Sequence, residues 1–193
     1  MLKQAFKEWA VICRALAQGR QAIILRKGGI AEAHGAFEVE HTRFWLYPTY
    51  VHQQCGGIKP EARALLDEVE QDRPPMGTVQ LTHFAEVPRV YHVGNLETVL
   101  RLQDLHCWSE ETVRARFAYR WPGLYVLPVR VYRAAQTYDV VESAKYTGCK
   151  SWVDLEEGLA TEGAIPVLPE DVFASLLQTV EQICLSRGSS QEA

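Results

Sequence analysis

The sequence of 193 residues has no long hydrophobic run, since nothing in it approaches the roughly 18 consecutive apolar positions that a membrane-spanning helix needs. Its start, Met-Leu-Lys-Gln-Ala-Phe-Lys-Glu, has neither the apolar stretch nor the small-residue cleavage site of a secretory signal. We therefore expect a soluble, cytoplasmic protein without a membrane partner.

The sequence also has no C-x-x-C pair. Its cysteines are odd in number and lie far apart, which argues against a disulfide framework and against a structural zinc site. We expect them to be buried as small hydrophobic residues. They are Cys13, Cys55, Cys107, Cys149 and Cys184.

Several motifs of known chemistry are missing. The sequence contains no P-loop, no G-x-G-x-x-G after a strand, no H-E-x-x-H and no E-x-K. We expect no cofactor and no bound metal. Glu38, Glu40 and Lys27 are nevertheless the residue types that metal-dependent nucleases use, so a nuclease or other phosphodiester hydrolase is the alternative function.

Charge is unevenly distributed along the chain, whose formal net charge is −4. Residues 1–30 carry six Lys or Arg against one acidic residue, whereas residues 134–193 carry three against ten. A wholly basic chain would indicate nucleic-acid binding, and this chain can at most present a local basic face. The acidic end is either a solvated surface or, as a second alternative function, a protein-interaction module.

The first 30 residues allow two structures. Two β-branched runs, Val11-Ile12 and Ile23-Ile24, flank a short segment that contains Gly19, which favours a hairpin. A helix over residues 2–16 is the competing interpretation because the alanines also fit a period of 3.6. We predict the hairpin.

Further along, strands are expected within residues 37–47, 78–93, 123–133 and 150–155. Helices are expected from Pro60 to the Pro74 stop, from an Asn95 cap to Leu105, after Ser109, and over residues 171–185. With 47% hydrophobic and 23% charged residues, the chain is typical of a globular protein. The pattern predicts one α+β domain over residues 1–186 and a frayed tail over 187–193. The sheet is expected to be mainly antiparallel and flanked by three to four helices, and it can curl toward a barrel.

The strongest candidate for a site is the segment Arg26, Lys27, Gly28 and Gly29 at the end of an expected strand. Glycines beside two cations can hold a phosphate through backbone N–H groups and charge-assisted hydrogen bonds. A tight turn with two solvated cations is the alternative.

A second candidate is a polar and aromatic cluster around Pro48. Rings that stack, combined with amide or histidine donors, are typical of sites that recognise an unpaired base. The same rings can instead belong to the core. The cluster comprises His41, Arg43, Tyr47, Thr49, Tyr50, His52 and Gln53. The candidate ligand-binding residues are His41, Arg43, Tyr50, His52 and Gln53, to which Lys150 and Trp152 are added.

A third set combines arginines with rings between residues 114 and 133. Such arginines can grip phosphates, or they can pair with the acidic end of the chain, and we favour the ion pairs. The set comprises Arg114, Arg116, Tyr119, Arg120, Trp121, Arg130, Tyr132 and Arg133.

Short segments spread over residues 3–185 carry a family resemblance. They are Phe6-Lys7-Glu8-Trp9-Ala10, Leu25-Arg26-Lys27-Gly28-Gly29-Ile30, Phe37-Glu38-Val39, Leu46-Tyr47-Pro48-Thr49, His52-Gln53 and Cys149-Lys150-Ser151-Trp152-Val153. In their order the chain resembles the bacterial, mainly cyanobacterial, "domain of unknown function 1802" family. Some members are joined to restriction-endonuclease-like domains, which implies a place in DNA restriction or modification.

These observations together predict a non-enzymatic module that binds nucleic acid or a nucleotide-like ligand. Arg26 and Lys27 would hold phosphate, while Tyr50, His52, Gln53 and Trp152 would contact a base. The expected partners are nucleic acid or a nucleotide, and a restriction-type nuclease.

Overall fold

Two β-sheets organise the chain in the computed structural model, which describes residues 1–27, 41–51, 53–146, 148 and 151–186. The larger sheet has six strands in the order β8-β1-β3-β4-β7-β9, and the smaller has three in the order β2-β6-β5. The strands are β1 (Leu2–Trp9), β2 (Ile23–Arg26), β3 (Arg43–Thr49), β4 (Thr78–Glu86), β5 (Tyr91–Val93), β6 (Leu124–Pro128), β7 (Arg130–Val141), β8 (Trp152–Leu159) and β9 (Ile165–Pro166). The α-helices are α1 (Ala10–Ala17), α2 (Ala64–Gln71), α3 (Leu96–Leu100), α4 (Glu110–Ala118) and α5 (Glu170–Leu185).

The α+β class with mainly antiparallel pairing is confirmed. Every strand pair named above is antiparallel except β1 with β3, which is parallel. The larger sheet is open, with β8 and β9 at its edges, and does not close into a barrel. The described residues contain five α-helices, one more than the sequence predicted. The expected tail over 187–193 lies outside the described residues.

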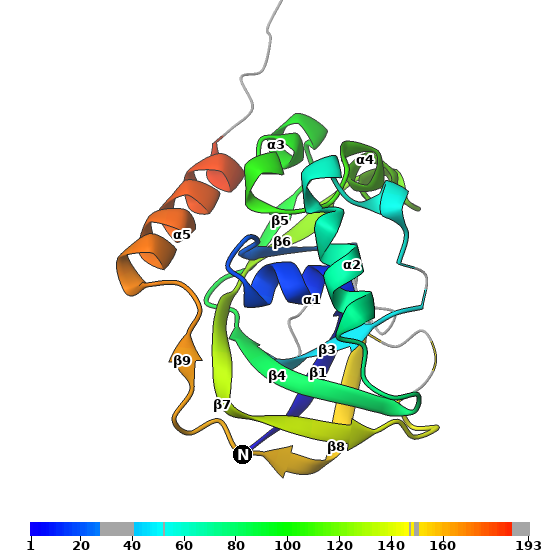
Figure 1. The fold of residues 1–193 in the computed structure, drawn as a ribbon. Coiled ribbons are helices and arrows are strands. Elements are labelled where there is room, and N and C mark those ends of the chain that lie inside the picture. Colours follow the sequence, from blue (N-terminus) through cyan, green and yellow to red (C-terminus); the bar gives the residue numbers. More distant parts are fainter. Residues whose placement is uncertain (28–40, 52, 147, 149–150, 187–193) are drawn as a thin grey trace, which may run out of the picture.

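The two sheets are joined by chain segments that pass from one into the other. β6 and β7 are separated by Val129 alone, whose N–H donates to the carbonyl of Ala22 (2.9 Å). β4 and β5 likewise lie in different sheets and are separated by a bend that contains Pro88. Figure 1 shows these strands curving around α1, which lies between the two sheets.

Helix α1 replaces the first half of the predicted hairpin, and that prediction was wrong. Strand β1 runs straight into α1, and the following run, Ile23–Arg26, is the strand β2. Val11 and Ile12 favour a strand locally, but six of the eight side chains of α1 are buried. A mostly apolar helix is stable when other elements enclose it, and this tertiary burial outweighs local propensity.

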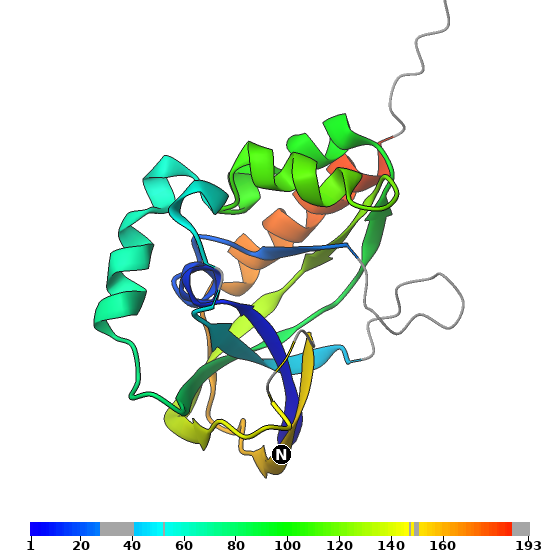
Figure 2. The same cartoon turned by 90° about the vertical axis from the view of Figure 1, so that its right-hand side faces the viewer.

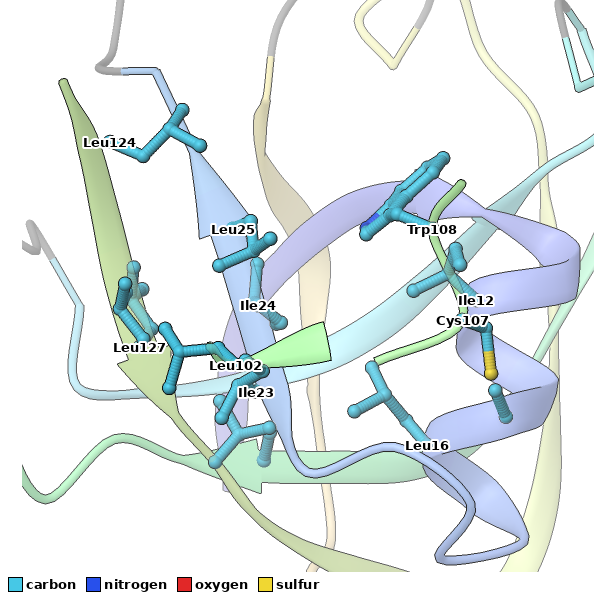
Figure 3. Packing of buried hydrophobic residues seen from close by; sticks show 14 of the residues in the cluster. Ile12, Leu16, Ile23, Ile24, Leu25, Leu102, Cys107, Trp108, Leu124 and Leu127 are labelled. Atoms are coloured by element: carbon cyan, nitrogen blue, oxygen red, sulfur yellow. The ribbon is translucent and has the colours of Figure 1, made fainter. Parts of the chain in front are cut away.

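The larger cluster of buried hydrophobic residues packs α1 against the smaller sheet. Ile12 and Leu16 of α1 meet Ile23 and Leu25 of β2, and Trp108 covers them from the segment before α4 (Figure 3). These five side chains are at most 1% exposed. Burial of such a side chain contributes about 1.5–3 kcal/mol each, so the position of α1 between the sheets is strongly fixed.

The remaining helices follow their sequence signals. Asn95 Oδ1 accepts the N–H of Thr98 (3.0 Å) and caps α3, while Ser109 Oγ accepts the N–H of Thr112 (3.3 Å) and caps α4. Helices α3, α4 and α5 gather around the smaller sheet, and α2 lies beside α1 (Figure 2). None of the helices in the described part of the chain is long and apolar enough to cross a membrane.

Candidate functional site

The parallel pairing of β1 with β3 brings the carboxyl ends of both strands to one edge of the larger sheet. Glu8 lies opposite Pro48 and Trp9 opposite Thr49. The hydroxyl of Thr49 donates to the carbonyl of Glu8 (3.0 Å), which ties the two ends together. The backbone of Trp9 is extended and α1 begins at the next residue, so the chain turns sharply here.

A groove with a volume of about 600 Å³ opens at this edge. Its walls come from the ends of β1 and β3, from the segment after α2, from the end of β7 and from α4. Its lining includes four cationic side chains, Lys7, Arg26, Arg73 and Arg116, but only two carboxylates, Glu8 and Glu142. The described lining therefore has an excess of positive charge. The rings of Trp9, Tyr47, Tyr50 and Tyr146 also face it.

Glu8 is the buried acid of this groove, with only 4% of its surface exposed. Its Oε1 accepts the N–H of Trp9 (2.9 Å), while its Oε2 has no hydrogen-bond partner among the described residues. The nearest cation is Arg26, whose Nη1 lies 3.8 Å from Oε2. This ion pair compensates the charge of the carboxylate but does not provide it with a hydrogen bond.

Arg26 and Arg116 carry the positive charge deepest in the groove. The Arg26 guanidinium stacks over Phe6 (4.4 Å to the ring centroid), and its Nη2 donates to Ser151 Oγ. The Arg116 guanidinium lies 3.7 Å from the ring centroid of Trp108 and donates to the carbonyl of Leu25 (3.4 Å). Burial lowers the pKa of both groups, and the neighbouring Glu8 carboxylate opposes this. Both remain cations at neutral pH because a guanidinium keeps its proton in proteins.

Ring packing holds the apolar side of the groove in place. The Trp9 ring meets Trp108 at 4.9 Å and passes close to Gly57, where a Cβ would lie 2.7 Å from a Trp9 ring carbon. Only glycine accommodates this approach. On the other side, the Tyr47 hydroxyl contacts Glu142 (3.4 Å), and burial together with that carboxylate raises the pKa of Tyr47. Both rings therefore have fixed positions.

The structure separates the two cations that were predicted to hold phosphate together. Arg26 lines the groove, whereas Lys27 Nζ donates to the carbonyl oxygens of Phe117 (2.8 Å), Gly123 (2.9 Å) and Trp121 at the end of α4. Gly28 and Gly29 lie outside the described residues. So do Glu38 and Glu40, the carboxylates of the nuclease alternative.

The predicted base-contacting residues are dispersed. Tyr50 lines the groove under the Arg73 guanidinium (4.6 Å to the ring centroid). Gln53 instead links α1 to α2, since its Oε1 accepts the N–H of Val11 (3.3 Å) and its Nε2 donates to Glu70 (3.0 Å). His52 and Lys150 lie outside the described residues.

Three further candidates are not part of the groove lining. They are His41, Arg43 and Trp152. The Trp152 ring contacts the rings of Phe6 (4.9 Å) and His41 (5.3 Å). Because Arg26 stacks on Phe6, Trp152 and His41 belong to the ring cluster that supports Arg26. Arg43 is paired with Glu86 (3.1 Å) at the other end of β3. The structure thus brings together Arg26 and Tyr50 in the groove and places the other described candidates elsewhere.

The third arginine set also divides. Arg130 pairs with Glu170 of α5 (2.7 Å), as the ion-pair interpretation expected, and Arg114 pairs with Glu110 within α4 (2.7 Å). Arg116 is the member that reaches the groove. In the part of the chain that the structure describes, no three His, Cys, Asp or Glu side chains meet in a group that could hold a metal ion.

Sequence reasoning missed Glu8, Lys7 and Ser151 as groove residues, whereas Tyr47 was already a member of the cluster around Pro48. One signal was available for Glu8, which is the single acidic residue among the first 30. An isolated carboxylate in a basic segment is a candidate for a buried ion pair, and here it is paired with Arg26.

Three solved structures are similar to the chain, all of ASCH from Zymomonas mobilis. The unmutated protein and one point mutant are each 14% identical to this chain, with TM-scores of 0.46. Each match covers 91% of this chain, and it covers 93% of the unmutated protein and 94% of the mutant. A second point mutant is 13% identical, with a TM-score of 0.47. This match covers 92% of this chain and 98% of the mutant.

No curated protein sequence matches the chain. The resemblance noted in the sequence is confirmed, because one family model covers residues 5–179, which is most of the chain. The chain therefore belongs to the family described as "Domain of unknown function (DUF1802)".

Proposed function

We propose that the groove binds a nucleotide unit, either free or as part of a single-stranded nucleic acid. Arg73 and Arg116 contact the phosphate, and the rings of Trp9 and Tyr50 contact the base. The observation that carries this proposal is the excess of cations in the lining, with the guanidinium groups of Arg26 and Arg116 sharing one carboxylate, Glu8.

Size and chemistry support this ligand class. Pockets for small molecules and cofactors are typically about 300–1,000 Å³, and the groove falls within that range. Guanidinium groups bind phosphate oxygens through paired, charge-assisted hydrogen bonds, and stacking on aromatic rings tolerates any base. One groove thus offers contacts for both halves of a nucleotide.

Binding is tested by fluorescence anisotropy with labelled single- and double-stranded oligonucleotides at about 50 and 200 mM salt, with free mononucleotides as competitors. We expect micromolar binding that weakens with salt and prefers single strands. Competition by mononucleotides shows that one unit suffices for recognition. Absence of binding at micromolar protein, or binding that salt does not affect, would overturn the proposal.

Substitutions locate the binding site. Arg26→Gln is expected to weaken binding about 10- to 100-fold, as loss of a charge-assisted hydrogen bond does. Arg73→Gln removes a groove cation that also stacks over Tyr50 (4.6 Å) and pairs with Glu70 (3.3 Å), and it should weaken binding and lower the salt slope by about one. Arg43→Gln is the matched control, since Arg43 is engaged with Glu86 away from the groove. An equal loss in Arg43→Gln and Arg73→Gln contradicts the assignment.

A place in DNA restriction or modification, with a restriction-type nuclease as partner, is part of this proposal and is supported by the family resemblance alone. Cleavage of plasmid with Mg²⁺ by the chain itself would instead favour the nuclease alternative. In a pure binding module, we expect none.

A further inference from the structure

Glu8 is the feature of the groove that phosphate binding does not use. Its side chain is 3% exposed, and its Oε2 is a buried acceptor without a hydrogen-bond partner among the described residues. A buried polar atom without a hydrogen-bond partner destabilises the fold, and the cost is larger for a charged group. Such an atom in a groove lining indicates that a ligand supplies the missing donor.

The neighbours of Glu8 determine what kind of donor fits. Oε1 is already engaged by the N–H of Trp9, so one oxygen is left for a ligand. Beside it, 3.8 Å away, stands Nη1 of Arg26, while Nη2 of the same guanidinium is held by Ser151. The groove therefore presents an acceptor and a donor side by side, on two side chains that are fixed by other contacts.

We propose that Glu8 and Arg26 read the edge of the base and select an amino base, adenine or cytosine, over its keto counterpart. This rests on the proposed function, because it assumes that a nucleotide occupies the groove. In cytosine and adenine an amino group that donates lies next to a ring nitrogen that accepts. The amino group faces Oε2 of Glu8, and the ring nitrogen faces the guanidinium of Arg26.

Keto bases reverse this pattern. Uracil and hypoxanthine place a carbonyl oxygen where the amino group stands and an N–H where the ring nitrogen accepts. A carboxylate cannot donate and a guanidinium cannot accept, so both positions are mismatched. A site built to pair with a substrate donor rejects the analogue that lacks it, because the buried groups of the site remain unpaired.

The test compares CMP with UMP and AMP with IMP by isothermal titration calorimetry on the full chain. A well-placed pair of hydrogen bonds discriminates between bases by about 10- to 100-fold, and we expect CMP and AMP to bind more tightly by that factor. N4,N4-dimethyl-CMP, which has no amino N–H, is expected to bind about as weakly as UMP.

The variant Glu8→Gln replaces a pure acceptor by an amide that both donates and accepts. We expect it to bind CMP and UMP within about twofold of each other. Glu142→Gln is the control with the same change of charge in the same lining. It should raise the affinity of all nucleotides alike, since one carboxylate no longer repels phosphate, and it should preserve the preference for CMP.

The outcomes distinguish the two proposals. If none of the four nucleotides binds, the proposed function fails together with base selection. If all four bind equally, or if UMP and IMP bind more tightly, base selection is overturned while nucleotide binding stands. The measurements on the unmodified chain decide this even if Glu8→Gln does not fold.

Discussion

Lys27 holds the turn that follows α4, and its removal should destabilise the fold measurably. Its ammonium donates to three backbone carbonyl oxygens, those of Phe117, Trp121 and Gly123. Hydrogen bonds to a charged group are worth about 1.5–3 kcal/mol when well buried, but here part of the ammonium faces solvent. The substitution Lys27→Met keeps the apolar stem and removes the three donors. We expect it to lower the free energy of unfolding by about 2 kcal/mol.

A urea titration with circular dichroism as the readout measures this change in the free energy of unfolding. For a chain of this size, about 2 kcal/mol corresponds to a fall in Tm of about 4–8 °C. Lys145→Met is the matched control, because Lys145 makes an exposed ion pair with Glu156 (2.9 Å), and such pairs contribute little to stability. Equal effects of the two substitutions would refute a special role of Lys27 in the turn.

Two further predictions concern a helix cap and a buried histidine. Asn95→Ala removes the acceptor of the Thr98 N–H and should cost about 1 kcal/mol in urea denaturation, whereas Asn95→Asp, which keeps an acceptor, should cost less. Burial lowers the pKa of His106 from 6.5 to about 4, so its neutral form stabilises the fold fully above about pH 6.5 and this contribution is lost as the pH falls toward 4. Between pH 7 and 5 this amounts to about 2 kcal/mol, and the pH dependence should flatten in His106→Asn, which keeps an acceptor for the Trp108 N–H. His83, whose pKa burial also lowers to about 4, contributes to the slope that remains, and an unchanged slope in His106→Asn contradicts the assignment.

Helices α2, α3 and α4 were located through explicit end signals, whereas α5, which has no side-chain cap, was located through its apolar spacing. Asn95 and Ser109 cap α3 and α4, and α2 ends before Pro74. The β1–α1 segment has no such signal, since Trp9 at the N-cap of α1 provides no side-chain hydrogen bond. Its alanines and β-branched residues fit either structure, and only enclosure between the two sheets decides for the helix.

The groove was harder to predict than the elements because its residues come from distant segments. Glu8 is the last residue but one of β1, Arg26 ends β2, Tyr50 follows β3, and Arg116 projects from α4. Their meeting depends on the parallel pairing of β1 with β3, which sequence patterns do not reveal when the connecting segment is misassigned as a hairpin.

One separation in the site follows from strand geometry and could have been inferred in advance. Successive side chains of a strand point to opposite faces, so two adjacent cations at a strand end cannot both approach one phosphate. Arg26 ends β2 and Lys27 is the next residue, and they contact different parts of the fold: Arg26 meets Glu8 and Ser151, whereas Lys27 meets the turn after α4. A second cation for the same ligand therefore has to come from elsewhere in the chain, and Arg116 is the residue that the fold brings to it.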